Sequence, residues 1–599
     1  MTVNAPKTLR SMAGDKLSRR RVLGGIVTTA MASALMACSS QSPTTSSSAP
    51  TPAPAASTSA APTSAPAAAA TAPAAAKAPT TAPSTSASTA ASSSVPGKTL
   101  VVAVEQDASS LKPDTWGPYL NWYAARCLYD TLVHYGVKKG PDGLTYYDDS
   151  SWEMHLASKV DISEDRQTVT WTMRDGVKFA SGKPIDAPAV VKSFQWYLDR
   201  NEVGGGQAKV DGLVSRDAVS AQGNQVIMKL KFPAPWGAIA NYISLLSIVD
   251  ADEIMKHATS TDKFGAKWLE RNATPSGAFT LDKWVPGEQM VVSARKDWYG
   301  YTGKTGIDRI IFQVVPDPSV RFSLLKRGQA QLVSVLDFKD LVTLKDDPNI
   351  VTDSWVGNDW TYIGLNWNQK EFQDKNVRKA IATAIPTADI LNTVYYGFAV
   401  PSKTPFGSRV IGSDPSTWPY TYNVDQAKQY MAKSGYPSGF PVTFSIPNND
   451  VSQVKSSQLI ADALGKIGIK VNIEQQTSAQ NSDALVAKKL AMSITDFVSF
   501  VPDAGYHALW NHLPDSYANY FDYKNPEQEK IGRQMLYMDP NDPKRIALLK
   551  QYQQIMADDV FAVYFATVKA AVTHHKNLSG FAYYPDTAQV LRFDNLTLK

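Results

Sequence analysis

Histidines, carboxylates and glycine-rich turns are the residues that could support catalysis, metal binding or phosphate binding in this chain. His507 and His512 are five residues apart and His574 and His575 are adjacent, so neither pair has the i, i+4 spacing of a helical metal site; solvated or hydrogen-bonded histidines are favoured. The segment TGKTG shares residues with a phosphate-binding loop, but Trp298 occupies the position of the required first glycine. No Gly-x-Ser-x-Gly sequence occurs, and no carboxylate pair can be selected for acid–base catalysis. We therefore predict no catalytic residue, no metal site and no cofactor.

Aromatic residues are better candidates for a binding site. A β-branched run in residues 98–107 predicts a buried strand, and Trp116, Tyr119, Trp122 and Tyr123 follow it. Ligands of α/β folds bind beyond the carboxyl ends of strands, and aromatic faces suit both peptides and sugars. Trp116, Tyr119 and Trp122 are therefore predicted to contact a ligand, while core packing of two of the four remains an alternative.

The N-terminal segment combines positive charge with a short apolar run. Residues 22–37 are uncharged, but 16 residues is short of the roughly 20 that a membrane-spanning helix needs. Basic residues ahead of a short apolar run and small residues are the parts of an export signal, which we assign to residues 1–37. Residues 18–23 resemble a twin-arginine signal, and the general secretory route is the alternative.

Cys38 ends this segment. Residues 35–38 (LMAC) resemble the lipobox of bacterial lipoproteins, in which the cysteine thiol is joined to diacylglycerol. Two acyl chains hold a protein stably, so the resemblance implies lipidation at Cys38 and anchoring at the outer face of the cytoplasmic membrane. The alternative is an incidental cysteine after an ordinary cleavable signal.

The following stretch, residues 38–97, consists almost entirely of Ser, Ala, Pro and Thr. This composition cannot bury a core, so it predicts a disordered tether that would place the body about 45 Å from the membrane. The positive net charge comes from residues 1–97, which carry +6, because residues 98–599 carry a net charge of −1. This nearly neutral body gives no indication of nucleic-acid binding. Cys127 is its only cysteine, which excludes an internal disulfide and suits a buried apolar position.

The 502 residues of the body are enough for about three domains, and their pattern alternates strands with helices. Residues 308–333 predict a strand, a turn, a helix that ends at Gly328 and a second strand. Residues 456–476 predict a helix, a left-handed cap at Gly468 and a strand. The fold class is therefore α/β.

Five segments in order carry a more specific resemblance. They are residues 128–136 (LYDTLVHYG), 156–196 with Arg-x-Gly-Val-Lys-Phe and Gly-Lys-Pro, 275–299 with Trp-x-Pro-Gly, 362–390 with Val-Arg-x-Ala-Ile, and 425–439 with Gly-Tyr. Over residues 98–599 the chain resembles the peptide/oligopeptide-type substrate-binding proteins of ABC importers, solute-binding protein family 5. The resemblance implies a periplasmic-binding-protein-like (type II) clamshell of two lobes with an additional domain. Lobe I would comprise residues 98–135, 272–362 and 565–599, the additional domain 136–271, and lobe II 363–564.

The resemblance also points to ligand contacts in lobe II. Peptide-binding members have a Trp and, three residues later, an Asp that pairs with the ligand's α-ammonium group; the matching positions here are Phe497 and Phe500. Asp496 or Asp503 could replace the carboxylate only if the loop is shifted. A buried ammonium without a carboxylate is unfavourable, so a free peptide N-terminus is less secure as the ligand group.

Three further aromatic residues complete the predicted site. Trp360 and Tyr362 lie near the expected crossover between the lobes, with hinge packing as the alternative, and Trp510 follows the Phe497 segment. The remaining predicted ligand-binding residues are therefore Trp360 and Tyr362 near the crossover, and Phe497, Phe500, Asp503 and Trp510 in lobe II.

The resemblance implies a lipid-anchored extracytoplasmic receptor that captures a peptide or related small polar solute between its lobes. It would deliver the solute unchanged to ABC permease and ATPase subunits, which are other chains, and a monomer is expected. An oligosaccharide receptor of the same family is the first alternative. A surface-anchored hydrolase and a sensory or chaperone-like binding module are alternatives from other classes.

Overall fold

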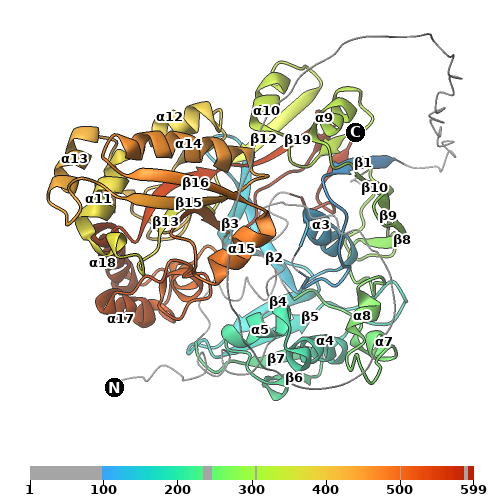
Figure 1. Ribbon diagram of the computed structural model, residues 1–599. Coiled ribbons are helices and arrows are strands. Elements are labelled where there is room, and N and C mark those ends of the chain that lie inside the picture. Colours follow the sequence, from blue (N-terminus) through green and yellow to red (C-terminus); the bar gives the residue numbers. More distant parts are fainter. Residues whose placement is uncertain (1–97, 116, 234–245, 304–305, 499–500, 586–590) are drawn as a thin grey trace, which may run out of the picture. The chain divides into compact units, whose positions relative to one another are not determined.

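The computed structural model describes residues 98–599 except residues 116, 234–245, 304–305, 499–500 and 586–590 (Figure 1). The predicted export signal, the tether, Cys38, Trp116 and Phe500 therefore lie outside the described residues. Within the described part, none of the helices has the length and apolar character needed to cross a membrane.

The first sheet combines segments from both ends of the described chain. Its strands, in spatial order, are β12 (Ile350–Trp355), β19 (Ala570–His575), β11 (Leu332–Val333), β1 (Thr99–Val104), β10 (Arg309–Val314), β9 (Gln289–Ala294) and β8 (Phe279–Val285). Strand β1 runs parallel to β10 and β11, whereas β9 and β19 pair in the antiparallel direction with their neighbours. The strand predicted within residues 98–107 is thus confirmed as β1, a central strand.

The second sheet has a different set of strands. They are β14 (Ala399–Pro401), β18 (Ala562–Val568), β13 (Trp360–Leu365), β17 (Met492–Phe497), β15 (Pro441–Pro447) and β16 (Lys470–Gln476). Every residue of β13 is buried, which is the pattern of a strand covered on both faces. Strand β15 runs parallel to β16 and to β17.

A third, antiparallel sheet has the order β4 (Ala157–Ile162), β5 (Thr168–Met173), β7 (Gln225–Lys229) and β6 (Val219–Gln222). The hairpin of β2 (Val133–Lys139) and β3 (Thr145–Met154) precedes it, and β20 (Leu578–Ser579) pairs with β21 (Thr597–Leu598) near the end of the chain. Figure 1 shows helices α4 (Ala187–Arg200) and α5 (Val203–Val210) beside the third sheet. Helix α4 contacts β6 and β7 directly.

The remaining helices connect and cover these sheets. They are α3 (Tyr119–Leu128), α7 (Ala251–Met255), α8 (Ala266–Leu269), α9 (Pro318–Lys326), α10 (Phe338–Leu344), α11 (Lys375–Ala384), α12 (Thr387–Thr393), α13 (Val424–Ala432), α14 (Val451–Gly465), α15 (Ser478–Val486), α16 (Ala504–His507), α17 (Pro526–Met535) and α18 (Pro543–Asp559). Short helical turns occur at η1 (Arg216–Ala218), η2 (Glu371–Gln373), η3 (Pro415–Thr417) and the π-helical η4 (Ala508–His512).

The helix–strand units begin and end where local chemistry predicts. Asp186 caps α4, because its side chain accepts a hydrogen bond from the backbone N–H of Ala189. Asp450 caps α14 in the same way, and Gly468 takes φ +89° before strand β16, a conformation that suits glycine. The helix and strand predicted in residues 456–476 are therefore confirmed.

The hydrophobic core divides between β12 and β13. One cluster of buried residues includes the first and third sheets, whereas another is confined to residues 360–566 and surrounds the second sheet. The chain passes between the two larger sheets through residues 356–359 and again at Lys569, between β18 and β19. A smaller third cluster lies beside the first sheet, around α9 and α10. The two larger cores, joined by short crossings, form two lobes.

Candidate ligand-binding site

Strands β15, β16 and β17 run parallel, so their carboxyl ends lie at the same edge of the second sheet. Asp496 and Phe497 are the last residues of β17. Asp450 follows β15, and its Oδ1 accepts hydrogen bonds from the backbone N–H groups of Ser452 at 2.9 Å and Gln453 at 3.0 Å. Ligands of α/β folds bind at this kind of edge.

Asp496 is the most unusual charged group at this edge. Its side chain is partly exposed, and among the described residues no side chain makes a hydrogen bond or ion pair with its carboxylate. Burial raises the pKa of Asp496 to about 6, and the neighbouring Asp450 carboxylate contributes to the rise. The carboxylate is therefore held in the fold without a compensating cation.

Tyr119 is a residue of lobe I that lies towards this edge of the second sheet. It begins α3, and its side chain is 37% exposed. Burial raises the pKa of Tyr119, and the carboxylates of Glu105, Asp359 and Asp496 raise it further. Glu105 directly follows β1 in the first sheet, whereas Asp496 ends β17 in the second sheet.

Phe497 and Trp510 belong to one group of aromatic rings. The ring of Tyr506 lies 6.3 Å from that of Phe497 and 6.1 Å from that of Trp510, measured between centroids. Tyr506 and Trp510 are partly exposed, whereas Phe497 is buried. Sequence reasoning missed Tyr506, although its i, i+4 spacing from Trp510 is the signal that places both on one helical face.

Other aromatic residues of the predicted site are buried in the core. Trp122 and Tyr123 are buried, and the Tyr123 ring stacks on Tyr119 at 6.0 Å. Trp360 and Tyr362 are 0% and 1% exposed, and their rings stack at 4.3 Å inside the core of lobe II. These residues are packed in the core, which is the alternative that the sequence left open for them. Their contact with a ligand stays a prediction.

Asp503 has an internal partner. Its side chain is buried, and its Oδ1 accepts hydrogen bonds from Arg545 Nη2 at 2.7 Å and from the backbone N–H of Gly505 at 2.7 Å. The guanidinium therefore neutralises the carboxylate that sequence reasoning offered as a ligand contact. A role for Asp503 in binding stays a prediction, but its charge is already balanced by Arg545.

The prediction of solvated or hydrogen-bonded histidines is wrong for His507. The imidazoles of His507 and His512 are both buried, and neither His507 nitrogen has a hydrogen-bond partner in the described part of the chain. Burial lowers the pKa of His507 to about 3, so it remains neutral. Both rings pack beside Phe406, at 5.4 and 5.5 Å between centroids, because aromatic packing in the core takes precedence over solvation.

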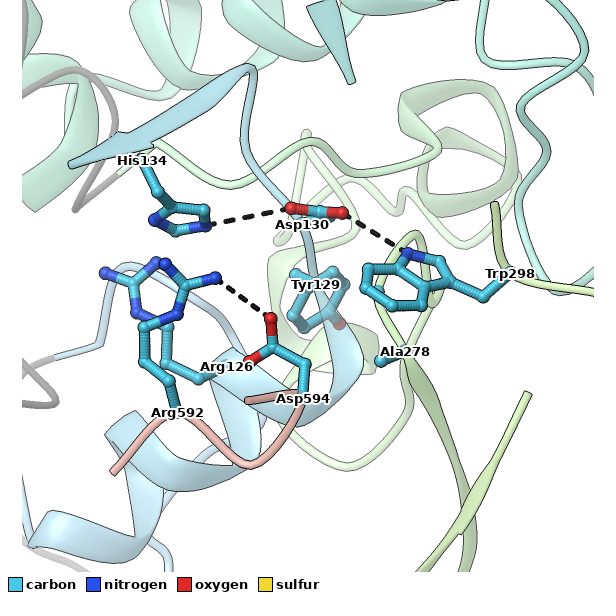
Figure 2. Close-up of a pocket in the computed structure, with 9 residues that line it drawn as sticks. Arg126, Tyr129, Asp130, His134, Ala278, Trp298, Arg592 and Asp594 are labelled. Carbon is cyan, nitrogen blue, oxygen red and sulfur yellow. Dashed lines mark hydrogen bonds and ion pairs between the residues drawn. The ribbon is translucent and has the colours of Figure 1, made fainter. Parts of the chain in front are cut away.

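A second polar cluster lies around Asp130 (Figure 2), and it joins residues of the predicted lobe I to His155 of the predicted additional domain. Asp130 Oδ1 accepts hydrogen bonds from the backbone N–H of Thr131 at 2.8 Å and from His155 Nδ1 at 3.0 Å. Its Oδ2 accepts from the Tyr299 hydroxyl at 2.8 Å and from Trp298 Nε1 at 3.3 Å. The adjoining cavity is about the size of one water molecule, so it is no solute site.

The same cluster has the composition of a metal site. One potential ligand atom from each of Asp130, His134 and His155 lies within 4.8 Å of the others. However, His134 Nε2 already lies 3.0 Å from Thr131 Oγ1, and His155 Nδ1 is bound to Asp130. Burial lowers the pKa of His134, and the Arg592 guanidinium lowers it further. We interpret the cluster as a hydrogen-bonded ion pair that sequence reasoning missed.

The strand-end geometry and the two cores have a counterpart among known proteins. A family model described as bacterial extracellular solute-binding proteins, family 5 Middle, matches residues 151–517, more than half of the chain. The chain belongs to this family. The glutathione-binding protein GsiB of Escherichia coli O6:K15:H31 (strain 536 / UPEC) is 25% identical over 503 residues, covering 82% of this chain and 93% of GsiB.

Solved structures share the fold of this family 5 protein. DppA, an ABC transporter-associated periplasmic binding protein from Helicobacter pylori in complex with the peptide STSA, has a TM-score of 0.70 and 24% identity, covering 84% of this chain and 98% of DppA. AgaA from A. tumefaciens R10, in complex with agropinic acid, has a TM-score of 0.65 and 20% identity, covering 84% and 99% of the two chains. The predicted α/β, periplasmic-binding-protein-like clamshell is thus confirmed.

Family membership also fixes the general activity. Members of family 5 bind solutes and are not enzymes, so the hydrolase alternative is rejected. This family 5 protein is an extracytoplasmic solute-binding protein of an ABC transporter.

Proposed function

We propose that the chain is a lipid-anchored receptor that captures a peptide or related small polar solute between its two lobes and delivers it, unchanged, to an ABC permease. The observation that carries the proposal is the division of the chain into two cores joined by short crossings, with partly exposed aromatic rings on both sides, Tyr119 on one and Tyr506 and Trp510 on the other. A solute placed there contacts both lobes at once. It therefore favours the closed state through its differential contacts, and the closed surface is what the permease recognises.

The ligand class is supported by the relatives. GsiB is named for glutathione, a peptide, and the H. pylori DppA structure contains the peptide STSA. Of the predicted residues, Tyr119, Phe497 and Trp510 have the surroundings that suit ligand contact best, and Tyr506 joins them. The proposed domains follow the predicted division into lobe I (98–135, 272–362 and 565–599), the additional domain (136–271) and lobe II (363–564). The limits between the lobes move to the crossings at residues 356–359 and Lys569, because β13 and β18 belong entirely to the second sheet.

Peptide capture is testable on the purified body, residues 98–599. Native mass spectrometry should find a co-purified solute of unchanged mass. The matching peptide should stabilise the protein by about 2.7 kcal/mol at 100 times its Kd, since binding to the folded state alone contributes RT ln(1 + [L]/Kd). Thermal denaturation across panels of peptides and oligosaccharides measures this. Stabilisation by oligosaccharides alone would refute the peptide class.

Anchoring is tested at Cys38. Replacement Cys38→Ser should move the exported protein from the membrane fraction to the soluble extracytoplasmic fraction and abolish incorporation of labelled fatty acid, because the acyl chains are attached through the thiol. Cys127→Ala is the matched control, since the Cys127 side chain is buried. Membrane association of the Cys38→Ser protein equal to that of the control would contradict the anchor.

A further inference from the structure

The turn between β4 and β5 carries an arginine in an unusual backbone conformation. Arg166 has φ +56°, a left-handed conformation that glycine and asparagine adopt more readily than other residues. Its backbone N–H donates to the carbonyl of Ser163 at 2.8 Å, and Asp165 Oδ1 accepts a hydrogen bond from the backbone N–H of Gln167 at 3.0 Å. The turn is thus fixed by its own hydrogen bonds, and a strained conformation that the surroundings maintain favours a functional role for the residue.

The Arg166 side chain reaches from the third sheet to lobe II. Its Nη2 donates a hydrogen bond of 2.5 Å to the backbone carbonyl of Tyr537, and its Nη1 lies 3.3 Å from Asp539 Oδ2. The Arg166 side chain is 17% exposed, so water has little access to these contacts. The third sheet belongs to one core whereas Tyr537 packs against the other, and Arg166 and Tyr537 are 371 residues apart in the sequence. The guanidinium therefore joins the two lobes.

Lobe II positions the acceptors for this arginine. Tyr537 and Asp539 lie in the loop between α17 and α18. Asp539 Oδ1 accepts a hydrogen bond from the backbone N–H of Asn541 at 2.9 Å, whereas Oδ2 faces the guanidinium. Met535 precedes the loop, and its carbonyl accepts a hydrogen bond from Arg545 Nε at 3.0 Å. Each side of the contact is thus ordered within its own lobe, so joining them costs little conformational entropy.

An aromatic pair adds a second contact between the same two parts of the chain. Phe232 follows β7 of the third sheet, and its ring lies 4.6 Å from that of Tyr537 between centroids. Gly212 takes φ +102° and leaves space for this ring, since a Cβ atom at Gly212 would lie 3.2 Å from Phe232 Cε2. Ring pairs at such separations stabilise a contact beyond the area that they bury. The third sheet therefore meets lobe II at two adjoining points.

These contacts must break when the lobes separate. The chain crosses between the two larger sheets at residues 356–359 and at Lys569, and rotation about these crossings would move the α17–α18 loop away from the third sheet. A hydrogen bond from a charged donor contributes more than a neutral one, whereas an exposed ion pair contributes little. Because Asp539 is 54% exposed, the bond from Arg166 to the Tyr537 carbonyl is the main interaction.

We propose that the contacts of Arg166 and Phe232 with lobe II form a latch that holds the lobes closed in the absence of a solute. The latch comprises Arg166, Phe232, Tyr537 and Asp539. This inference rests on the proposed function, in which the lobes close around a solute, and it adds that part of the closure is built into the chain. A closed state that is already populated lowers the apparent Kd, because less of the binding free energy is spent on closing the lobes.

Small-angle X-ray scattering tests the latch without any solute. The sample is the ligand-free body, residues 98–599, which contains all the sheets of the described structure. The wild-type profile should match the profile calculated from the structure. Arg166→Asn should have a larger radius of gyration, because losing a hydrogen bond from a charged donor should raise the ratio of open to closed protein by about tenfold or more. Asparagine adopts a positive φ readily, so the turn should keep its conformation.

A matched control separates the latch from a general loss of surface charge. Arg216 pairs with Asp199 of α4, so this ion pair lies wholly beside the third sheet. Arg216→Asn removes the same charge and should leave the radius of gyration unchanged.

A double variant tests the pairing across the lobes. Asp539→Asn should open the lobes less than Arg166→Asn does, because the bond to the Tyr537 carbonyl remains. In Arg166→Asn the further change Asp539→Asn should have no effect, since the carboxylate has already lost its partner. An increase in the double variant equal to the sum of the two single increases would show that the residues do not act together.

The outcomes separate the latch from the proposed function. A wild-type radius larger than that of the structure, or a radius of Arg166→Asn equal to that of wild type, would overturn the latch and leave solute binding intact. If no solute stabilises the wild-type body and none co-purifies with it, the proposed function fails, while the scattering still decides the latch.

Discussion

Replacing Asp130 by asparagine is expected to lower the free energy of unfolding by about 3–5 kcal/mol, the usual cost of breaking a buried ion pair. The Asp130 carboxylate is 4% exposed and accepts hydrogen bonds from His155, Tyr299, Trp298 and the backbone of Thr131. Asparagine has no charge, and its amide nitrogen would face one of these donors. Urea denaturation followed by circular dichroism measures the loss.

The effect of Asp130→Asn should depend on pH in a defined direction. Burial lowers the pKa of His155, but the Asp130 carboxylate outweighs burial and raises it to about 9. The stability from this pair is therefore complete below the unfolded histidine pKa of 6.5 and is lost as the pH rises through 9. The difference between wild type and Asp130→Asn should shrink between pH 7 and pH 10.

A surface ion pair supplies the control for Asp130. Asp252 is 43% exposed and pairs with Lys183 and Lys192, so Asp252→Asn should cost less than about 1 kcal/mol. If Asp130→Asn were no more destabilising than Asp252→Asn, the interpretation of the cluster as a buried ion pair would be wrong.

Removal of the Arg545 guanidinium should have an effect of similar size in lobe II. Arg545→Met is expected to cost about 3–5 kcal/mol, because Asp503 would keep its charge in a position that is 3% exposed. The lost hydrogen bond from Arg545 Nε to the Met535 carbonyl, 3.0 Å long, adds to the cost. The midpoint of urea denaturation measures the change.

The double variant tests this explanation. Asp503→Asn combined with Arg545→Met removes both charges, so it should recover part of the stability lost in Arg545→Met alone. A double variant whose loss equals the sum of the two single losses would show that the ion pair is not the cause.

Local patterns predicted the helix–strand units well. In α14 and β16 the spacing of apolar residues, the cap at Asp450 and the turn at Gly468 all indicate the same structure. Such agreement among short-range signals is enough to place an element. The order of strands within each sheet depends on pairing between distant segments, so it could not be predicted from these local patterns.

The candidate site could be predicted only in part. Residue type alone does not separate an exposed aromatic ring such as Tyr119 from a core ring such as Trp360, since both suit an apolar surface. The pairing of Asp503 with Arg545 could not be predicted either, because the two residues are 42 positions apart in the sequence.

The cluster of Asp130, His134 and His155 could not be predicted from the sequence for a related reason. His134 and His155 become neighbours because β2 pairs with β3, which places His134 opposite Glu153. Their rings lie 4.2 Å apart between centroids. The adjacency is a product of strand register, which residue spacing along the chain does not reveal.

Cys127 has a practical consequence for studying lobe closure. Its side chain is fully buried, and burial raises the pKa of its thiol well above the usual value, so maleimide reagents have neither access nor thiolate to attack. In a chain that begins at residue 98, one cysteine introduced on each lobe would therefore carry the only reactive thiols. A fluorophore pair attached there would report solute-driven motion by energy transfer, without altering the native cysteine.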